Sequence, residues 1–445
     1  MDFKKIPSTV SRWYKLTGLY LLKFVKKHYI ILAMALVTVV AVVARYMFVM
    51  YPTNDLAGFI INGWMGQIDE LGFDKFYLVY SDYPPIFLFF LAFLCMLPEG
   101  ELTTQYSGGY GYTFYANRMV YLKTLFLIFT IALAFGVFLL VKELTKSNNK
   151  ALVGYIATLV LPTIFVNSSV WGNADVIYAV FLIFSFYFAL KDNSSLSFVF
   201  FGLSFANKLQ AIFILPFLIY LVVSRKLKLW PIVFAPLVYF ITFVPAFIYG
   251  ATFSEAFKYF EMQLSGQPGL TYNAGTIWKF LELNDSEIVV KNAMWFAILA
   301  IGALLAVLFL RNVDLKKKEN VFKVGFMLTM ATIFFLPRMH ERYYFIIEVL
   351  IVVYALIDKK WIYLVPLMQL STMICYYPYL TGYYIISSLG GGTITIAAII
   401  NLFILCVSVY DVLKIERTPL YQGVLEIENE INELKNDKKS IEEQS

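Results

Sequence analysis

Charge and cysteine are both scarce in this sequence of 445 residues. Only 15% of the residues are Asp, Glu, Lys or Arg, and the chain has three cysteines and two histidines. Ordinary soluble domains carry about 25% charged residues, so the composition argues against that class. Cys95, Cys375 and Cys406 lie far apart in apolar segments, so they offer no metal-ligand spacing and are expected to be packing residues.

The motifs of several common enzyme classes are also absent from the sequence. It has no Walker glycine loop, no GxSxG and no HExxH. With two histidines in the whole chain, a Ser-His-Asp triad is not expected. Nucleotide hydrolysis, serine-hydrolase chemistry and zinc proteolysis therefore find no support, and no nucleic-acid partner is expected.

Apolar residues dominate what is present. The chain is 60% hydrophobic and 18% aromatic, and apolar stretches of about the length needed to cross a membrane recur between residues 29 and 410. Closed barrels show weaker, alternating segments, so the pattern predicts an all-α, polytopic helical membrane protein. The first apolar run, residues 29–51, is too long for a signal-peptide core and is expected to remain as a span.

Basic loops predict the orientation of the chain, because short loops rich in Lys and Arg stay cytoplasmic. Such loops occur at residues 142–150, 191, 224–228, 311–318 and 357–360, and from 414 onward. Alternation between them predicts about twelve spans with both termini inside the cell. Residues 1–28 are then a cytoplasmic amphipathic segment, 29–413 the membrane domain and 414–445 a charged helical tail.

One apolar stretch, residues 85–98, does not fit this alternation as a crossing. It is short for a span, and counting it would invert every later loop against the charge rule. It is interpreted as a helix that lies in or dips into the outer leaflet. If it crosses, another short segment must fail to cross.

Five polar segments are then predicted to face the outside. They are the first outer loop (52–117), WGNAD (171–175), NKLQ (207–210), the second large outer loop (251–289) and RMHER (338–342). Ionisable groups at membrane depth are costly and usually line a cavity or pathway. Helix caps, snorkelling side chains and a solvated loop are the structural alternatives for the individual segments.

The ionisable groups of these segments suit one kind of chemistry. A phosphate leaving group needs cationic donors, and an attacking hydroxyl needs a carboxylate base. The segments supply both, as the carboxylates Asp55, Asp82 and Asp175, the cations Lys208, Arg338 and Arg342, and His340.

The order of motifs resembles the membrane glycosyltransferases of the GT-C superfamily. The motifs are an Asp after the first span, DYPP, WGNAD, FANKLQAIFILP, YNAGTIW and LPRMHERYYF. The resemblance covers about residues 29–413. It is strongest to the bacterial branch similar to the mannosyltransferase that adds the second mannose of GPI anchors, and weaker to the dolichol-dependent glucosyltransferases of N-glycan assembly.

This resemblance implies an inverting hexosyltransferase, with mannose as the default sugar. The donor is a polyprenyl-phosphate sugar, the acceptor is a hydroxyl on a glycan or lipid-linked molecule, and transfer occurs on the extracytoplasmic face of the cell membrane. Asp55 matches the family's catalytic base. Family members line their site with residues that match Asp82, Tyr83, His340, Glu341 and Arg342, and Glu341 is expected to orient an arginine.

Two further positions and a metal question follow from the same resemblance. The lysine of the family's KQ-like pattern matches Lys208, while Gln210 is separated from it by a leucine. A related branch binds a metal through a carboxylate pair near Asp175. Here Asn173 and Asp175 have no second acid beside them, so a divalent metal is not expected, and no other cofactor is implied.

A transporter or flippase of lipid-linked saccharides is the alternative interpretation. It would also be polytopic and hold charges in a cavity, but near the bilayer midplane and usually between repeated halves. The sequence has no evident internal repeat, and its polar turns are predicted to gather at one face. The transferase is therefore the preferred hypothesis.

Overall fold

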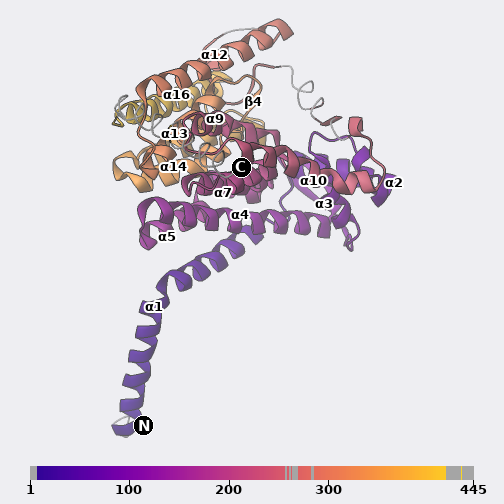
Figure 1. Ribbon diagram of the computed structural model, residues 1–445. Coiled ribbons are helices and arrows are strands. Elements are labelled where there is room, and N and C mark those ends of the chain that lie inside the picture. The colour runs from indigo at the N-terminus through magenta and orange to yellow at the C-terminus, as the bar shows by residue number, and fades with distance from the viewer. Residues whose placement is uncertain are drawn as a thin grey trace, which may run out of the picture.

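The structure is a computed structural model that describes residues 8–255, 258–259, 262, 269–281, 285–416 and 432. The described chain is mainly helical, and its helices pack side by side while the N-terminal helix projects away from them (Figure 1). This confirms the all-α class. Most of the predicted tail, residues 414–445, lies outside the described residues, which end there at Glu416 apart from residue 432.

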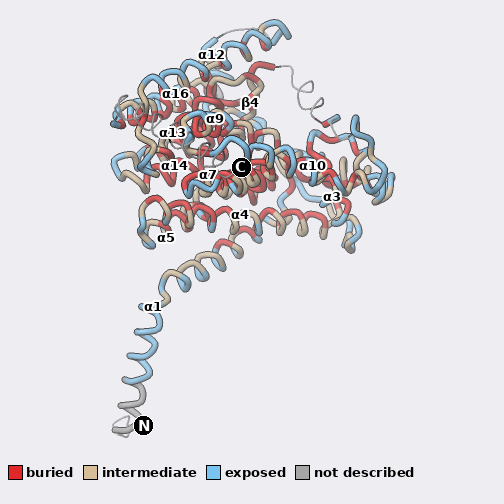
Figure 2. Tube along the Cα trace, in the orientation of Figure 1, coloured by how far each residue is buried: buried red, intermediate tan, exposed pale blue. Residues whose placement is uncertain are grey.

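The projecting element, α1 (Ser8–Tyr46), is one continuous helix of 39 residues. At 1.5 Å per residue it is about 58 Å long, well beyond the hydrocarbon thickness of about 30 Å. The predicted amphipathic segment and the first span therefore share one helix, without a break at residue 28. Residues 16–27 of this helix are exposed (Figure 2), while the buried Arg45 near its C-terminal end donates to the Leu159 carbonyl at 2.8 Å.

The core is built from helices that are apolar on every side. Most residues of α13 (Lys318–Phe335) and nearly all residues of α14 (Phe345–Ile357) are buried, as expected for helices that are apolar around most of their circumference. α4 (Ala116–Thr145) packs along α5 (Asn148–Val160) and α7 (Asp175–Leu190), and α8 (Ser194–Phe205) covers α7.

Gly325 shows how closely these core helices pack. A Cβ at this position of α13 would lie 2.6 Å from the ring of Phe186 and 3.0 Å from that of Phe217. These two rings stack on each other with centroids 4.7 Å apart. Any larger residue at position 325 would separate α13 from α7, because protein interiors leave no room for an added methyl group.

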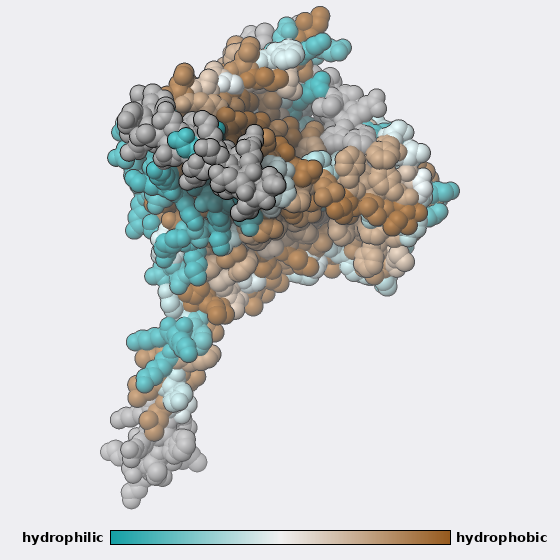
Figure 3. All heavy atoms as spheres, in the orientation of Figure 1, coloured by the Kyte–Doolittle hydropathy of each residue, from teal (hydrophilic) through white to brown (hydrophobic). Residues whose placement is uncertain are grey.

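Helices on the outside of the body expose apolar side chains. In α12 (Glu287–Arg311), for example, Leu299 is 71% exposed. Figure 3 shows a largely apolar visible surface on the body, with hydrophilic residues gathered at one side, near the α5 and α14 labels of Figure 1. A contiguous apolar exterior of this kind is stable when it faces lipid rather than water.

Five helical segments among the described residues are each long and apolar enough to cross a membrane. They are Leu16–Tyr46, Ala116–Thr145, Trp230–Ile248, Glu287–Arg311 and Gly392–Leu413. A sixth results if Asn148–Val160 and Pro162–Trp171, bent by 50°, form one span. The protein is thus a helical membrane protein of the multi-pass type, while the number twelve stays a prediction that requires shorter helices to cross as well.

The first outer loop contains more regular structure than the sequence predicted. Its elements are the π-helix η1 (Asn54–Met65), α2 (Gly66–Leu71), the 3-10 helix η2 (Phe73–Leu78), α3 (Pro85–Cys95) and the hairpin of β1 (Leu102–Ser107) and β2 (Tyr110–Tyr115). Gly108 and Gly109 form the hairpin turn with φ of 58° and 83°, the conformation that a two-residue turn requires. With 11 residues, α3 is about 17 Å long, shorter than the hydrocarbon thickness of about 30 Å, and its placement in the outer leaflet stays a prediction.

The chain breaks its helices at each predicted polar turn. WGNAD runs from the last residue of η3 (Val166–Trp171) to the first residue of α7, NKLQ follows α8 and ends in the first turn of η4 (Leu209–Ile214), and RMHER lies between α13 and α14. Within RMHER, β4 (Met339–His340) pairs in parallel with β3 (Thr271–Tyr272) from the second large outer loop.

The remaining elements complete the bundle. They are α6 (Pro162–Phe165), α9 (Leu215–Val223), η5 (Trp230–Val233), α10 (Phe234–Ile248), η6 (Ile277–Phe280), η7 (Lys359–Trp361), α15 (Leu364–Thr381), η8 (Ser387–Leu389) and α16 (Gly392–Leu413).

Candidate active site

A cavity of about 680 Å³ lies where the predicted polar turns meet. Its volume falls within the range of about 300–1,000 Å³ that is usual for small-molecule sites. Seven of the ten predicted site residues line it, namely Asp55, Asp82, Tyr83, Gln210, Arg338, His340 and Arg342. The other three, Asp175, Lys208 and Glu341, are not among its lining residues and are almost fully buried.

Asp55 is the second residue of η1, and Thr53 is the N-cap of that helix. Thr53 caps η1 by accepting from the amide of Leu56 at 3.3 Å, and its hydroxyl donates to the carbonyl of Trp171 at 2.8 Å. The cap therefore joins the first outer loop to WGNAD. This contact places the Asp55 side chain against the indole of Trp171.

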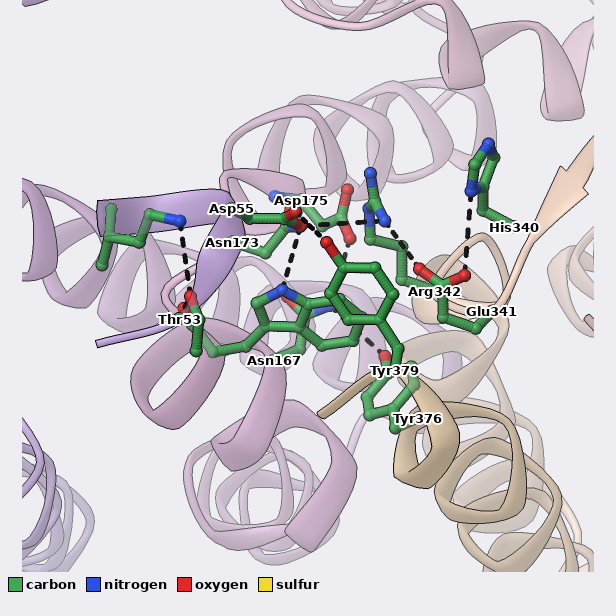
Figure 4. Close-up of polar contacts among 12 residues, drawn as sticks. Thr53, Asp55, Asn167, Asn173, Asp175, His340, Glu341, Arg342, Tyr376 and Tyr379 are labelled. Carbon is green, nitrogen blue, oxygen red and sulfur yellow. Dashed lines mark hydrogen bonds and ion pairs between the residues drawn. The ribbon is translucent and has the colours of Figure 1, made fainter. Parts of the chain in front are cut away.

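The Asp55 carboxylate is held by three neutral donors. Oδ2 accepts from Trp171 Nε1 at 3.0 Å and from Asn173 Nδ2 at 3.3 Å, and Oδ1 accepts from the Tyr379 hydroxyl (Figure 4). A guanidinium nitrogen of Arg342 lies 3.8 Å from Oδ2. The donors come from separate parts of the chain, so the carboxylate is fixed in orientation on the cavity wall.

A buried lysine supports this arrangement from behind. Lys123 of α4 donates to the backbone carbonyls of Phe48 at 2.8 Å, Tyr51 at 2.7 Å and Val170 at 3.3 Å. It thereby ties the end of the first helix to the turn that carries Trp171. The sequence signal was a single lysine in the apolar run that follows Arg118, which the sequence analysis did not single out.

Asp175 and Lys208 form a buried ion pair behind the cavity. The lysine ammonium contacts Asp175 Oδ1 and lies 5.2 Å from the ring centre of Tyr83. Burial lowers the pKa of Lys208, but the Asp175 carboxylate beside it more than offsets this, and the pKa is raised overall. With side chains 1% and 4% exposed, the two residues are placed to support the site rather than to touch a substrate.

Asn173 connects this pair to Asp55. Its Nδ2 donates to Asp55, and its Oδ1 accepts from the backbone amide of Asp175 at 3.2 Å. On the far side, Asn167 donates to Asp175 Oδ2 at 3.1 Å and to the Tyr376 hydroxyl at 3.3 Å. The candidate base therefore belongs to one hydrogen-bonded network with the buried pair (Figure 4).

The RMHER turn presents its cations from an unusual backbone. Arg338 has a φ of 62°, and its amide donates to the Leu270 carbonyl at 2.7 Å. A positive φ at a bulky residue costs free energy of the order of 1–3 kcal/mol and is found where the surrounding structure enforces it. The next two residues, Met339 and His340, form β4 and pair with β3. The ring of His340 stacks on that of Tyr272, with ring centres 4.6 Å apart.

Glu341 lies buried between the two basic residues that flank it. Its Oε1 is 2.6 Å from Arg342 and its Oε2 is 3.7 Å from His340 Nδ1. Burial alone would raise the pKa of Glu341. The contacts with His340 and Arg342 outweigh this effect, so the pKa is lowered overall and the carboxyl stays ionised. These contacts are the ones that an orienting role for Glu341 requires, and that role stays a prediction. The Arg342 guanidinium also lies 5.6 Å from the ring centre of Trp171, which restricts it further.

Tyr379 and Lys123 are among the residues at this site that sequence reasoning missed, as are Asn167 and Tyr376. Tyr379 belongs to α15, far from every polar turn in the sequence, and its ring stacks on Trp171 with centres 4.8 Å apart. Among the described residues, no three His, Cys, Asp or Glu side chains come together as a metal site would require. The expectation that no metal is needed stays a prediction.

Comparison with protein-family models gives no match for this chain, and a search of curated proteins gives none. The resemblance to GT-C glycosyltransferases thus rests on the motifs quoted above.

Proposed function

We propose that the protein transfers a hexose, with mannose as the default, from a polyprenyl-phosphate sugar to an acceptor hydroxyl with inversion at the anomeric carbon. The observation that carries this proposal is the position of Asp55. Its carboxylate is oriented by three neutral donors, and it shares the wall of a ligand-sized cavity with Arg342, 3.8 Å away. A base and a cation on one wall suit attack by a hydroxyl and departure of a phosphate.

The proposed reaction is a single displacement. The acceptor oxygen attacks the anomeric carbon of the donor sugar while its proton passes to Asp55. The bond between this carbon and the phosphate oxygen breaks, and its electron pair leaves with the polyprenyl phosphate. Because the leaving group is a phosphate, its departure needs no general acid.

Arg338, Arg342 and His340 bind the donor phosphate in this proposal. All three line the cavity, and Arg342 is held in place by Glu341 and Trp171. His340 Nδ1 lies 3.7 Å from Glu341 Oε2, and in the imidazolium form, with a proton on each ring nitrogen, Nε2 donates to a phosphate or sugar oxygen. Fixed cationic donors stabilise the charge that grows on the phosphate as the bond breaks.

The cavity also has an apolar part that suits the lipid carrier. The first isoprene units attached to the phosphate need a wall without unpaired polar groups. Such side chains are supplied by Phe59, Ile60, Trp64, Ile212, Phe213 and Met294. A sugar phosphate on a prenyl chain therefore matches the mixed lining better than a fully polar solute does.

The test is transfer by the purified protein in lipid nanodiscs. A synthetic polyprenyl-phosphate mannose with labelled sugar is mixed with neutral octyl glycosides, and products are separated and identified by mass spectrometry. We expect an acceptor glycoside extended by one hexose with inverted anomeric configuration. Donor that binds but is never consumed would overturn the proposal. If the same protein in liposomes then moves a fluorescent donor between leaflets, the flippase alternative is supported.

The proposed extracytoplasmic location is tested separately. α4 separates the β1–β2 hairpin from the basic turn before α5, so the two should lie on opposite sides of the membrane. In a background without native cysteines, Tyr106→Cys should react with an impermeant thiol reagent in intact cells, whereas Asn148→Cys should not. Labelling of Asn148→Cys alone would place the site on the cytoplasmic face.

A further inference from the structure

The β1–β2 hairpin in the first outer loop is rich in tyrosine and has no charge. Residues 102–115 read LTTQYSGGYGYTFY, with four tyrosines and no Asp, Glu, Lys or Arg. Tyr110 is 70% exposed and Tyr106 is 76% exposed, which is unusual for two aromatic side chains on so short an element.

The register of the hairpin separates its tyrosines onto two faces. Gln105 pairs with Tyr112 and Ser107 with Tyr110, so Tyr110 and Tyr112 share a face. The buried Phe114 belongs to the same face, so this face packs against the body at Phe114 and stays exposed at Tyr110 beside the turn. Tyr106 pairs with Gly111 on the opposite face, and its ring covers that glycine.

Two contacts attach the hairpin to the elements that hold Asp55. Asn62 of η1 donates to the Thr113 carbonyl at 3.0 Å. At the turn, a Cβ on Gly108 would lie 3.5 Å from the carbonyl oxygen of Leu380, the residue after Tyr379. The hairpin thus adjoins both the helix of the candidate base and the helix of its tyrosine partner.

Tyr112 lies within electrostatic reach of the candidate base. Burial raises its pKa, and the nearby groups of Tyr110 and Asp55 raise it further. Tyr51, which is 37% exposed, also raises the pKa of Tyr112. Tyr110, Tyr112, Tyr51 and Tyr379 are called the tyrosine rim below.

The rim and the cavity meet at Asp55. Asp55 and Tyr379 line the cavity, whereas the other three rim tyrosines are not among its lining residues. On the cavity side Arg342 lies 3.8 Å from the base, and on the rim side the uncharged phenol of Tyr379 donates to it. A reaction with two substrates needs two binding regions beside the base, because the acceptor must reach Asp55 while the donor phosphate is bound to the arginines.

We propose that the tyrosine rim binds the neutral saccharide part of the acceptor; this inference rests on the proposed function. Sugar rings present apolar C–H faces that pack on aromatic rings, while their hydroxyls bond to phenol oxygens. A surface without charge accepts such a ligand without leaving a desolvated ion behind. Tyrosine also loses little conformational freedom on binding, which favours contact with a flexible glycan.

The experiment measures how KM depends on acceptor length in nanodiscs, with the synthetic polyprenyl-phosphate mannose held saturating. The acceptors are neutral octyl glycosides with one, two or three sugar units, and monosaccharide glycosides with longer alkyl chains. For the wild type, KM should fall as sugar units are added. In Tyr110→Ala and Tyr112→Ala, KM for the trisaccharide should rise at least about 10-fold, the scale of a lost aromatic anchor, with donor Kd unchanged.

Matched variants separate binding from folding. Tyr112→Phe keeps the stacking surface and should remain close to wild type. Tyr106→Ala removes the same side chain from the other face of the hairpin, and its KM should stay within about two-fold. Thermal unfolding of all variants checks that the hairpin change does not disturb the body.

The outcomes are distinct for the two proposals. If the wild type transfers sugar but KM follows alkyl length rather than sugar number, the rim contacts lipid and this inference is wrong. It is equally wrong if Tyr110→Ala and Tyr112→Ala match Tyr106→Ala. Absence of transfer by the wild type with bound donor overturns the proposed function, and the rim inference with it.

Discussion

Two charge clusters among the described residues can be compared, one that lines the cavity and one that lies away from it. In the first, Asp55 and Arg342 share the cavity wall. In the second, Asp411 of α16 contacts Lys323 of α13 at 2.8 Å and Lys360 after α14 at 3.3 Å, and it accepts from the Tyr354 hydroxyl at 2.8 Å. None of these four residues lines the cavity.

The comparison shows what a buried charge does and does not indicate. Both carboxylates are held by several donors, and both join helices that are distant in sequence. At Asp411 two lysines neutralise the charge, and the contacts tie three helices together. At Asp55 the three hydrogen-bond donors are neutral and the nearest guanidinium is 3.8 Å away, which leaves the carboxylate able to act on a ligand. Burial of charge identifies both clusters, but the adjoining cavity identifies only the first as a site.

Removal of the candidate base should produce the largest difference between the clusters. Asp55→Asn keeps the shape of the side chain and loses its ability to accept a proton, so transfer should fall about 10³-fold. Donor Kd should change little, because the donor contacts the arginines. The measurements are single-turnover transfer and equilibrium binding of the synthetic polyprenyl-phosphate mannose in nanodiscs. Near-normal transfer would remove Asp55 from its role and make Asp82 the next base to test.

Arg342→Lys should have the second largest effect. Lysine keeps the charge but loses the planar fork that contacts Glu341 and covers Trp171, so transfer should fall about 10²-fold. Donor Kd should also rise, because phosphate charge is present before the reaction as well as during it.

The exposed Arg225 supplies the matched control for this change. Arg225 lies in the basic turn after α9 and is not among the residues that line the cavity. The variant Arg225→Lys should therefore retain transfer. Wild-type donor affinity in Arg342→Lys and Arg342→Ala would show that Arg342 does not bind the donor phosphate.

The sequence predicted the turns of the first cluster but not its full membership. Charged residues interrupt apolar runs at WGNAD, NKLQ and RMHER, and helices break there because ionisable groups are costly in hydrocarbon. Local pattern carried no information on Tyr379, which bonds to Asp55 across 324 positions of sequence. The hairpin of the first outer loop was missed for a related reason: its short strands have no strict alternation of apolar and polar residues.

The two supporting residues Asp175 and Lys208 should show intermediate effects. Lys208→Met leaves a carboxylate buried without its cation, a change that typically costs about 3–5 kcal/mol of stability. Transfer per folded molecule should fall about 10-fold, because Asn173 links the pair to Asp55. Thermal unfolding and transfer normalised to folded protein measure the two effects separately.

The double variant Asp175→Asn/Lys208→Met sharpens this result. It removes both charges, so its loss of stability should be smaller than the sum of the single losses. Strict additivity would mean that the pair contributes no mutual stabilisation. A much larger loss of donor binding than of stability would instead support direct contact of Lys208 with the phosphate.

Asp411→Asn should affect transfer least of all. The asparagine can still accept from Tyr354, but Lys323 and Lys360 lose their shared carboxylate, so stability should fall by about 1–3 kcal/mol. Lys323 is only 15% exposed and bears most of this cost, whereas Lys360, 52% exposed, can turn to water or keep its contact with Asp358.

Transfer per folded molecule should remain within about two-fold of wild type, because no member of this cluster touches the cavity. The folded fraction is measured by thermal unfolding, and transfer is measured at a temperature where both proteins are fully folded. A loss of transfer as large as that of Arg342→Lys under these conditions would break the distinction between the clusters. It would mean that the joined ends of α13, α14 and α16 control the position of the RMHER turn, which lies between the first two of these helices.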